Sequence, residues 1–254
     1  MIKYFKLIRQ KLFLENRVNK YLIYAIGEII LVVIGILIAL KINNWNEENK
    51  LRQLERKLLK DLIVEMKENK ALLINAKQRH RGHDSLSTVI LEKRPSLSPE
   101  NYLQHLIYTT YFATTDFVNG NVESIISEHG PSIITNDTLK EFITSWKEMG
   151  NDIIENELLE QQLIFDQILP VIYNSVDLSK IDPLIRGVEN SYVEYIRDIT
   201  LQNDIKNLVL SKEFNGVVYS KAFNDRIILN YDIELIIEKI SVAIEIAQRQ
   251  LEEN

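Results

Sequence analysis

The stretch YLIYAIGEIILVVIGILIALKINNWNE, residues 21–47, decides the fold class of the chain. From Tyr21 to Leu40 it carries one charged residue, Glu28, and its other side chains are apolar apart from two tyrosines. An α-helix needs about 20 such residues to cross a hydrocarbon core about 30 Å thick. The stretch therefore predicts a transmembrane helix over residues 21–42. A cleaved signal peptide is the competing interpretation, but no small-x-small cleavage site follows the apolar run.

The charges and aromatic side chains that flank this span predict its orientation. Residues 1–20 hold one acid, Glu15, and six basic residues: Lys3, Lys6, Arg9, Lys11, Arg17 and Lys20. Because basic flanks stay in the cytoplasm, we expect residues 1–20 to form a basic amphipathic cytoplasmic segment on the inner leaflet. Tyr21 and Tyr24 are then expected at the inner interface of the cell inner membrane and Trp45 at the outer one. The remainder would be periplasmic.

Composition excludes several classes of protein. The 254 residues include no cysteine, so the chain has no disulfide framework and no thiolate site. A formal net charge of -6 argues against a nucleic-acid partner, because phosphate binding needs a basic surface. Only eight glycines and five prolines interrupt the chain. We therefore predict an all-α protein, in which the transmembrane helix continues into an extracytoplasmic helical bundle.

Residues 43–254 are predicted to form this helical bundle domain. A stripe of leucines continues the first helix toward Arg81, and Gly82 predicts its end. Asn136 and Asp137 predict a helix start, and Gly150 predicts the end of that helix. The expected later helices cover residues 100–111, 138–148, 152–174 with a kink at Pro170, and 211–252, with a loop at 182–187. The inner side of the helix over residues 152–174 is predicted to comprise Ile154, Leu158, Gln161, Phe165, Ile168 and Ile172.

The segment RHRGHD contains the residues best suited to bind a metal. His80, His83 and Asp84 offer two imidazoles and a carboxylate, which are ligands for divalent metals. The spacing differs from the usual zinc helix, with its histidines four residues apart, and Arg79 and Arg81 would repel a cation. We interpret the segment as a solvated, charged helix end and predict no metal there.

The remaining polar residues give no catalytic pattern. His105 and His129 are isolated in the sequence, and we interpret them as packing or turn residues. Carboxylates such as Glu155, Glu157 and Glu160 are expected on a solvated helix face. No phosphate-binding loop, nucleophile elbow or zinc signature occurs. We therefore predict no enzyme activity, no catalytic residue and no cofactor.

The N-terminal block quoted above resembles a bacterial family of single-span membrane proteins, domain of unknown function 6090. The likeness rests on Gly27, Glu28, Gly35 and the run Asn43-Asn44-Trp45-Asn46. It extends through NVESIISEHGPSIITNDTLKEF and, more weakly, SKEFNGVVYSKAF, with His129-Gly130-Pro131 as a departure in the central turn. The resemblance implies a membrane location. It does not assign an activity, and it gives no functional residue.

Two functions are favoured on these residues, and an enzyme that uses the outer bundle is a third hypothesis that no motif supports. The first is a membrane-anchored interaction, scaffold or sensing module in the lipid bilayer, forming a homo-oligomer or binding another membrane protein. The alternative is an accessory subunit of an ion-driven or transport complex that uses Glu28. In either case one face of the span is predicted to make an intramembrane contact, because an acid in lipid favours a protein partner. That face comprises Gly27, Glu28, Leu31, Gly35 and Ala39.

Overall fold

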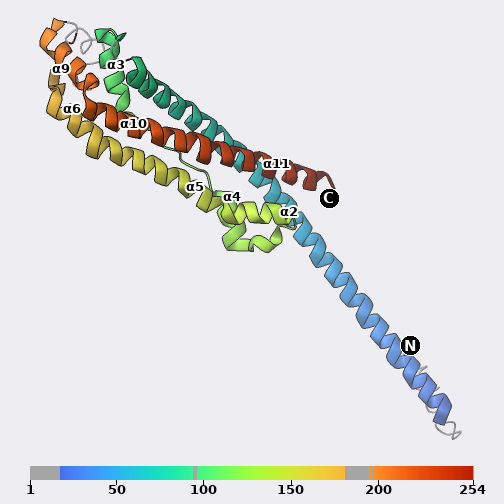
Figure 1. The fold of residues 1–254 in the computed structure, drawn as a ribbon. Helices are drawn as coiled ribbons and strands as arrows, with labels where there is room; N and C mark the ends of the chain where they lie inside the picture. The colour runs from blue at the N-terminus through green and yellow to red at the C-terminus, as the bar shows by residue number, and fades with distance from the viewer. Residues whose placement is uncertain (1–17, 94–95, 181–194, 196, 254) are drawn as a thin grey trace. The chain divides into compact units, whose positions relative to one another are not determined.

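The computed structural model describes residues 18–93, 96–180, 195 and 197–253 (Figure 1). These residues form helices joined by short connections, with no strand among them, which confirms the all-α prediction. The chain divides into two compact units, Met1–Lys57 and Leu58–Asn254. The predicted segment 1–20 lies outside the described residues up to residue 17, and the predicted loop at 182–187 lies wholly outside them.

Helix α2, Val18–Lys93, contains the apolar stretch. Within the first unit, the described side chains from Leu22 to Leu40 are exposed or nearly so. Among the described residues α2 is the one helix long and apolar enough to cross a membrane, so it is compatible with a single span. The predicted break at Gly82 is wrong, since α2 continues to Lys93. Glycine in a helix interior costs only about 1 kcal/mol relative to alanine, which flanking side chains that pack can offset.

The apolar stripe predicted for the first helix, from Leu51 to Leu73, is buried in the second unit at Leu58, Leu62, Met66 and Leu73, and Ala76 is buried as well. Leu51, in the first unit, is 53% exposed, so the prediction does not hold there. Two long helical stretches accompany the buried stripe, each interrupted by a π-helical turn. The first stretch is α5 (Asp137–Leu163), η4 (Ile164–Ile168) and α6 (Leu169–Ser175). The second is α10 (Lys212–Ile227), η6 (Ile228–Ile233) and α11 (Glu234–Glu253), which confirms the predicted C-terminal helix. Helix α9 (Ile199–Leu210) precedes it.

Helix α5 differs from the prediction at Gly150, which lies inside the helix instead of ending it. A Cβ atom at Gly150 would lie 3.4 Å from the ring of Phe117, so this glycine gives room for a close approach between segments. The predicted start is confirmed, because Asn136 caps α5 by accepting a hydrogen bond from the amide of Leu139 at 3.0 Å. Pro170 lies in the first turn of α6, directly after η4.

The inner face of α5 also differs from the prediction. Ile154, Leu158 and Phe165 are 38%, 50% and 52% exposed, although Ile168 and Ile172 are buried as predicted. The buried positions are instead Ile153, Glu157, Glu160, Ile164 and Ile168, spaced three or four residues apart. Two carboxylates therefore belong to the inward face.

The connection between α3 (Pro99–Thr109) and α4 (Gly120–Ser124) is held by side chains of α2. Asn69 donates to the carbonyl of Val118 at 2.7 Å and accepts from its amide at 2.8 Å. Glu65 accepts from the amides of Asn121, at 2.6 Å, and Val122, at 3.1 Å. These bonds fix the irregular connection at Val118 and the first turn of α4 beside α2 by satisfying their backbone groups. The short turns η2 (Ile125–His129) and η3 (Pro131–Ile133) lead from there to α5.

Candidate functional site

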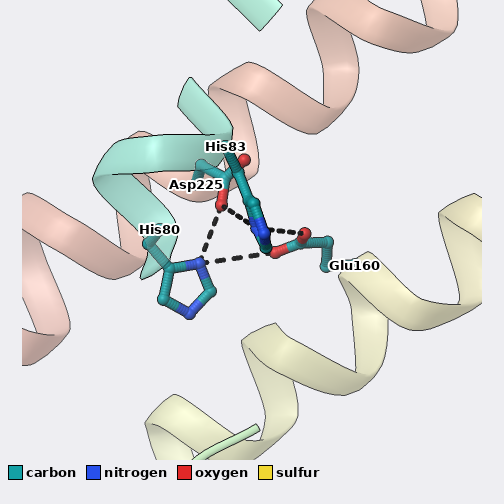
Figure 2. Close-up of side chains that lie close together, drawn as sticks. All are labelled: His80, His83, Glu160 and Asp225. Atoms are coloured by element: carbon teal, nitrogen blue, oxygen red, sulfur yellow. Dashed lines mark hydrogen bonds and ion pairs between the residues drawn. The ribbon is translucent and has the colours of Figure 1, made fainter. Parts of the chain in front are cut away.

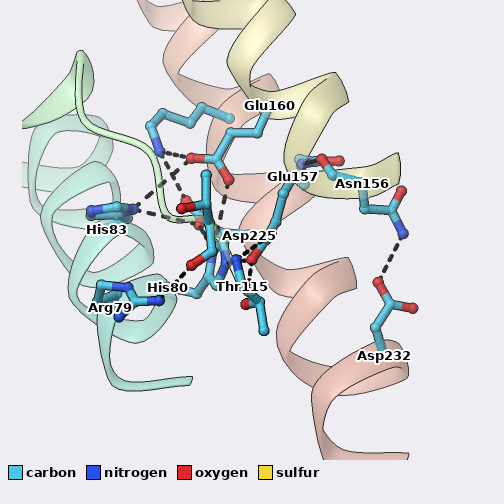
Figure 3. Close-up of polar contacts among 12 residues, drawn as sticks. Arg79, His80, His83, Thr115, Asn156, Glu157, Glu160, Asp225 and Asp232 are labelled. Atoms are coloured by element: carbon cyan, nitrogen blue, oxygen red, sulfur yellow. Dashed lines mark hydrogen bonds and ion pairs between the residues drawn. The ribbon is translucent and has the colours of Figure 1, made fainter. Parts of the chain in front are cut away.

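A cluster of ionisable side chains lies inside the second unit, between α2, α5 and α10 (Figure 2, Figure 3). Each helix contributes two residues separated by three or four positions, which places both on one helix face. The residues are His80 and His83 from α2, Glu157 and Glu160 from α5, and Lys221 and Asp225 from α10. We call these six side chains the buried cluster.

The burial of these groups contradicts two sequence predictions. His80, Glu160, Lys221 and Asp225 are 0% exposed and Glu157 is 4% exposed. The interpretation of RHRGHD as a solvated helix end is therefore wrong at His80, and that of Glu157 and Glu160 as solvated carboxylates is wrong for both. Only the His83 side chain, 12% exposed, lies at the rim. Buried charges are costly unless they are paired, so the contacts among the six groups decide their stability.

His80 lies at the centre of the buried cluster. Its Nδ1 lies 2.7 Å from Asp225 Oδ1 and 3.6 Å from Glu160 Oε2. Its Nε2 faces Glu157 Oε1 at 3.5 Å. Glu157 is itself fixed by Thr115, whose amide donates to Oε2 at 2.8 Å and whose hydroxyl donates to Oε1 at 2.7 Å (Figure 3).

Lys221 pairs with the two remaining carboxylates. Its ammonium donates to Glu160 Oε1 and lies 3.4 Å from Asp225 Oδ2. His83 Nδ1 lies 3.9 Å from Glu160 Oε1 and 3.9 Å from Asp225 Oδ1, beyond hydrogen-bond distance. His83 Nδ1 and Glu160 Oε2 are buried atoms without a hydrogen-bond partner.

The surroundings of the two histidines shift their pKa values in opposite directions. Burial alone would lower the pKa of His80, but hydrogen bonds with Asp225 and Glu157 and the nearby carboxylate charges raise it to about 9. Burial and the Lys221 ammonium lower the pKa of His83 to about 4. Burial and the Asp225 carboxylate raise the pKa of Glu160 to about 7, despite Lys221. At neutral pH His80 is therefore cationic and His83 is neutral.

The other residues named from the sequence lie outside the buried cluster. Asp84 points away and accepts a hydrogen bond from Arg226 Nε at 2.7 Å. Arg79 donates to the carbonyl of Thr114 at 2.8 Å. His105 is buried in α3, where its Nδ1 donates to the carbonyl of Asn101 at 2.6 Å, and His129 precedes Gly130, whose φ is +76°.

The predicted intramembrane face lies in the first unit. Gly27, Glu28, Leu31, Gly35 and Ala39 are exposed on α2. A Cβ atom at either glycine would meet no other heavy atom within 4 Å. Of the predicted interfacial anchors, Tyr24 and Trp45 are exposed, while the side chain of Tyr21 lies outside the described part of the chain. The contact itself stays a prediction.

The comparisons with known proteins bear on the first part of the chain. Residues 28–120 match the model of a family of unknown function (DUF6090). This match confirms the likeness to that family of unknown function over a range that includes Glu28, His80 and His83. Glu160, Lys221 and Asp225 lie beyond it. The extension of the likeness to residues 121–142 and 211–223 stays a prediction. No curated protein and no solved structure matches the chain.

Four interior residues of the buried cluster, Glu157, Glu160, Lys221 and Asp225, are not among the sites predicted from the sequence, although the sequence contains a signal for them. Glu157 and Glu160 continue the helical spacing of Ile153 and Ile164, which are both buried. Lys221 and Asp225 likewise occupy the same face of α10 as Val218 and Ala222. Charged residues that continue the helical spacing of a buried apolar face, acids on one helix and a lysine with an acid on another, are the pattern that indicates such a cluster.

Proposed function

We propose that the chain is a membrane-anchored helical interaction module, with scaffold or sensing roles, that acts by binding rather than by catalysis. One observation carries the proposal: α2 exposes an unbroken apolar stretch over residues 22–40, whereas Leu58–Asn254 has its own buried core. An exposed apolar surface of this length is unfavourable in water and favourable in hydrocarbon. Residues 21–42 would therefore anchor the helical unit in a bilayer.

The charges of the flanking residues support one orientation. Six basic residues precede the span against a single acid, so the N-terminus would remain in the cytoplasm. With this helix as a single span of the cell inner membrane, this orientation would put Leu58–Asn254 in the periplasm. Trp45 would lie at the outer interface, where indole rings are favoured.

We further propose a second copy of the chain as the partner within the membrane. A carboxyl group in lipid costs about 2.5 kcal/mol or more on insertion scales, so Glu28 favours a protein contact. Gly35 and Ala39 lie on the same face of α2 and form a small-xxx-small pair, which allows close approach of two helices. The second unit adds exposed apolar side chains on α5, at Ile154 and Leu158, suited to protein contacts.

A second candidate function rests on Glu28 alone. Glu28 is the one residue with an ionisable side chain in residues 25–40. Intramembrane acids often belong to proton or ion pathways. In this alternative the chain is an accessory subunit of an ion-driven or transport complex, and another membrane protein covers Glu28.

Single cysteines test the topology cleanly because the chain has none of its own. Asn16→Cys and Glu252→Cys, at opposite ends, are treated with a membrane-impermeant maleimide in right-side-out vesicles and again after lysis. We expect labelling of residue 252 in sealed vesicles and of residue 16 only after lysis. Labelling of residue 16 alone in sealed vesicles would show the opposite orientation. Extraction of the chain from membranes by carbonate would show that residues 21–42 do not anchor it.

Oxidative crosslinking tests the contact face. Ala39→Cys lies near Glu28 around the helix axis, whereas the control Leu37→Cys lies on the opposite side. Of these two positions, we expect disulfide-linked dimers from residue 39 only. Their yield should persist with Glu28→Gln and fall with Glu28→Leu. Equal crosslinking at both positions contradicts the face. Loss of a cellular phenotype with Glu28→Gln, while dimers persist, favours the ion-pathway alternative.

A further inference from the structure

The geometry points to a binding site for a divalent transition metal of the zinc type in the second unit, with His80, His83, Glu160 and Asp225 as its ligands. One nitrogen or oxygen from each of the four residues lies within 4.8 Å of all the others (Figure 2). This inference goes beyond the proposed function and does not depend on the membrane contact. It differs from the sequence prediction, which gave no metal to RHRGHD.

The distances between the four residues suit tetrahedral coordination. With metal–ligand bonds of about 2.1 Å, the ligand atoms of a tetrahedron are about 3.4 Å apart. The closest atom pairs span this value: 2.7 Å for His80 Nδ1 with Asp225 Oδ1, 3.6 Å for His80 Nδ1 with Glu160 Oε2, and 3.9 Å for His83 Nδ1 with Asp225 Oδ1. Small side-chain movements would give all four bonds.

Two of the proposed ligand atoms have no other hydrogen-bond partner. His83 Nδ1 and Glu160 Oε2 are buried and unsatisfied, which costs free energy in a folded protein. Glu160 is fully buried, so bulk solvent does not reach the carboxylate. A metal bound to both atoms would satisfy them together. This is an observation independent of the acidity of the cluster.

The surrounding residues already hold the ligands as metal sites require. Metal-binding histidines usually donate their second ring N–H to a carboxylate, which fixes the ring. The Nε2 of His80 faces Glu157 in this way, and Thr115 holds Glu157 through two hydrogen bonds. His80 Nδ1 is thereby directed at Asp225 and Glu160.

Lys221 is compatible with the metal because it uses different oxygens. Its ammonium contacts Glu160 Oε1 and Asp225 Oδ2, whereas His80 faces Glu160 Oε2 and Asp225 Oδ1. With neutral imidazoles, a divalent cation and Lys221 would carry three positive charges, and Glu157, Glu160 and Asp225 three negative charges. The filled site would then be neutral, as a buried site requires.

The ligand set selects the class of metal. Imidazole nitrogens favour zinc, nickel, copper and iron over magnesium and calcium, which take oxygen ligands. Four protein ligands complete a tetrahedral shell, so this is a closed site of the kind that stabilises or senses. His83, partly exposed at the rim, gives the ion a route of entry.

The test uses the full chain in detergent micelles, treated with chelator and titrated with zinc chloride by calorimetry. His83→Ala removes the ligand at the rim, and Asp84→Asn is the matched control because Asp84 belongs to the same motif but pairs with Arg226. We expect one zinc per chain, affinity at least about 10-fold weaker for His83→Ala, and an unchanged affinity for Asp84→Asn. Millimolar magnesium should not compete.

X-ray absorption of the zinc-loaded wild-type chain gives a readout that needs no variant. We expect four nitrogen and oxygen neighbours, two of them with the outer scattering of imidazole. Absence of stoichiometric zinc binding would overturn the inference, as would equal affinities of wild type and His83→Ala. If His83→Ala does not fold, the absorption spectrum decides: a shell without two imidazoles overturns the inference.

Discussion

Glu28 and Glu160 both follow apolar helical neighbours in the sequence, yet their surroundings in the structure are opposite. Glu28 is exposed on α2, and the isoleucine and leucine side chains beside it are exposed as well. Glu160 is buried on α5 with His80, Lys221 and Asp225 around it. The first region leaves its apolar surface for other molecules, whereas the second uses its interior to pair charges. An acid among apolar residues in a sequence can therefore belong to an exposed helix or to a buried charge cluster, and the charged residues around it distinguish the two.

Lys221 supplies the ammonium that neutralises the buried carboxylates of the second unit. Lys221→Met leaves Glu160 and Asp225 close together without this cation, and we expect the free energy of unfolding to fall by about 3–5 kcal/mol. Guanidinium unfolding of the metal-free chain in a Trp45→Phe background measures this, because buried Trp146 then reports on the second unit alone. Lys239→Met, at an exposed position on α11, is the control and should change little. An unchanged midpoint for Lys221→Met would show that the buried charges need no cation.

The free energy of unfolding of the metal-free chain depends on pH through the same buried groups. The pKa of His80 is raised from 6.5 to about 9, so its stabilisation is fully present below pH 6.5 and is lost as the pH rises through 9. The raised pKa of Glu160 acts in the same direction up to about pH 7. The lowered pKa of His83 acts below this window, because its stabilisation is lost as the pH falls through 4.

We therefore expect the free energy of unfolding to fall by on the order of 3 kcal/mol between pH 6.5 and 9. Unfolding curves at several pH values measure the fall, with His129→Gln as a variant that keeps it and His80→Gln as one that flattens it. A stability that rises over this interval would contradict the arrangement around His80.

A smaller effect is expected at Thr115, which fixes Glu157. Thr115→Val removes the hydrogen bond at 2.7 Å from the hydroxyl to Glu157. It keeps the shape of the side chain and the hydrogen bond from the backbone amide. Hydrogen bonds to charged groups contribute about 1.5–3 kcal/mol, so we expect a loss in this range. Thr144→Val is the matched control, because the exposed Thr144 hydroxyl bonds only backbone carbonyls of its own helix. Equal effects of the two substitutions would mean that Glu157 is held without Thr115.

The smallest effect is expected at the exposed glycines of α2. Gly82→Ala should stabilise the second unit by about 0.5–1 kcal/mol, because a Cβ there meets nothing within 4 Å and alanine favours a helix. Unfolding monitored at Trp146 measures the gain. Gly35→Ala, in the apolar stretch, should leave that unfolding unchanged. A loss of stability with Gly82→Ala would contradict the continuous helix through residue 82.

The sequence sufficed for features that depend on local chemistry. Asn136 was recognised as a helix cap because its side chain reaches its own helix, and the Leu58–Leu73 stripe was recognised because its spacing repeats. Gly82 and Gly150 were misread, since a glycine inside a helix differs from one that ends it only through its tertiary surroundings. Glu157 and Glu160 were assigned to solvent because their partners come from α2 and α10, at distances in the sequence that periodicity does not cover.

The separation of the partners along the chain has a consequence for synthesis. His80 and Asp225 are 145 residues apart in sequence, so at about 5–20 residues per second Asp225 is made roughly 7–30 s after His80. During that interval α10 is incomplete, and for roughly the first half of it α5 is incomplete as well, so the later part of α2 is not yet covered by both helices. Its own ionisable residues, which the finished protein buries, are then free to be hydrated. Polar side chains at these positions keep the nascent helix less prone to aggregate than an apolar face would, until the last helices arrive.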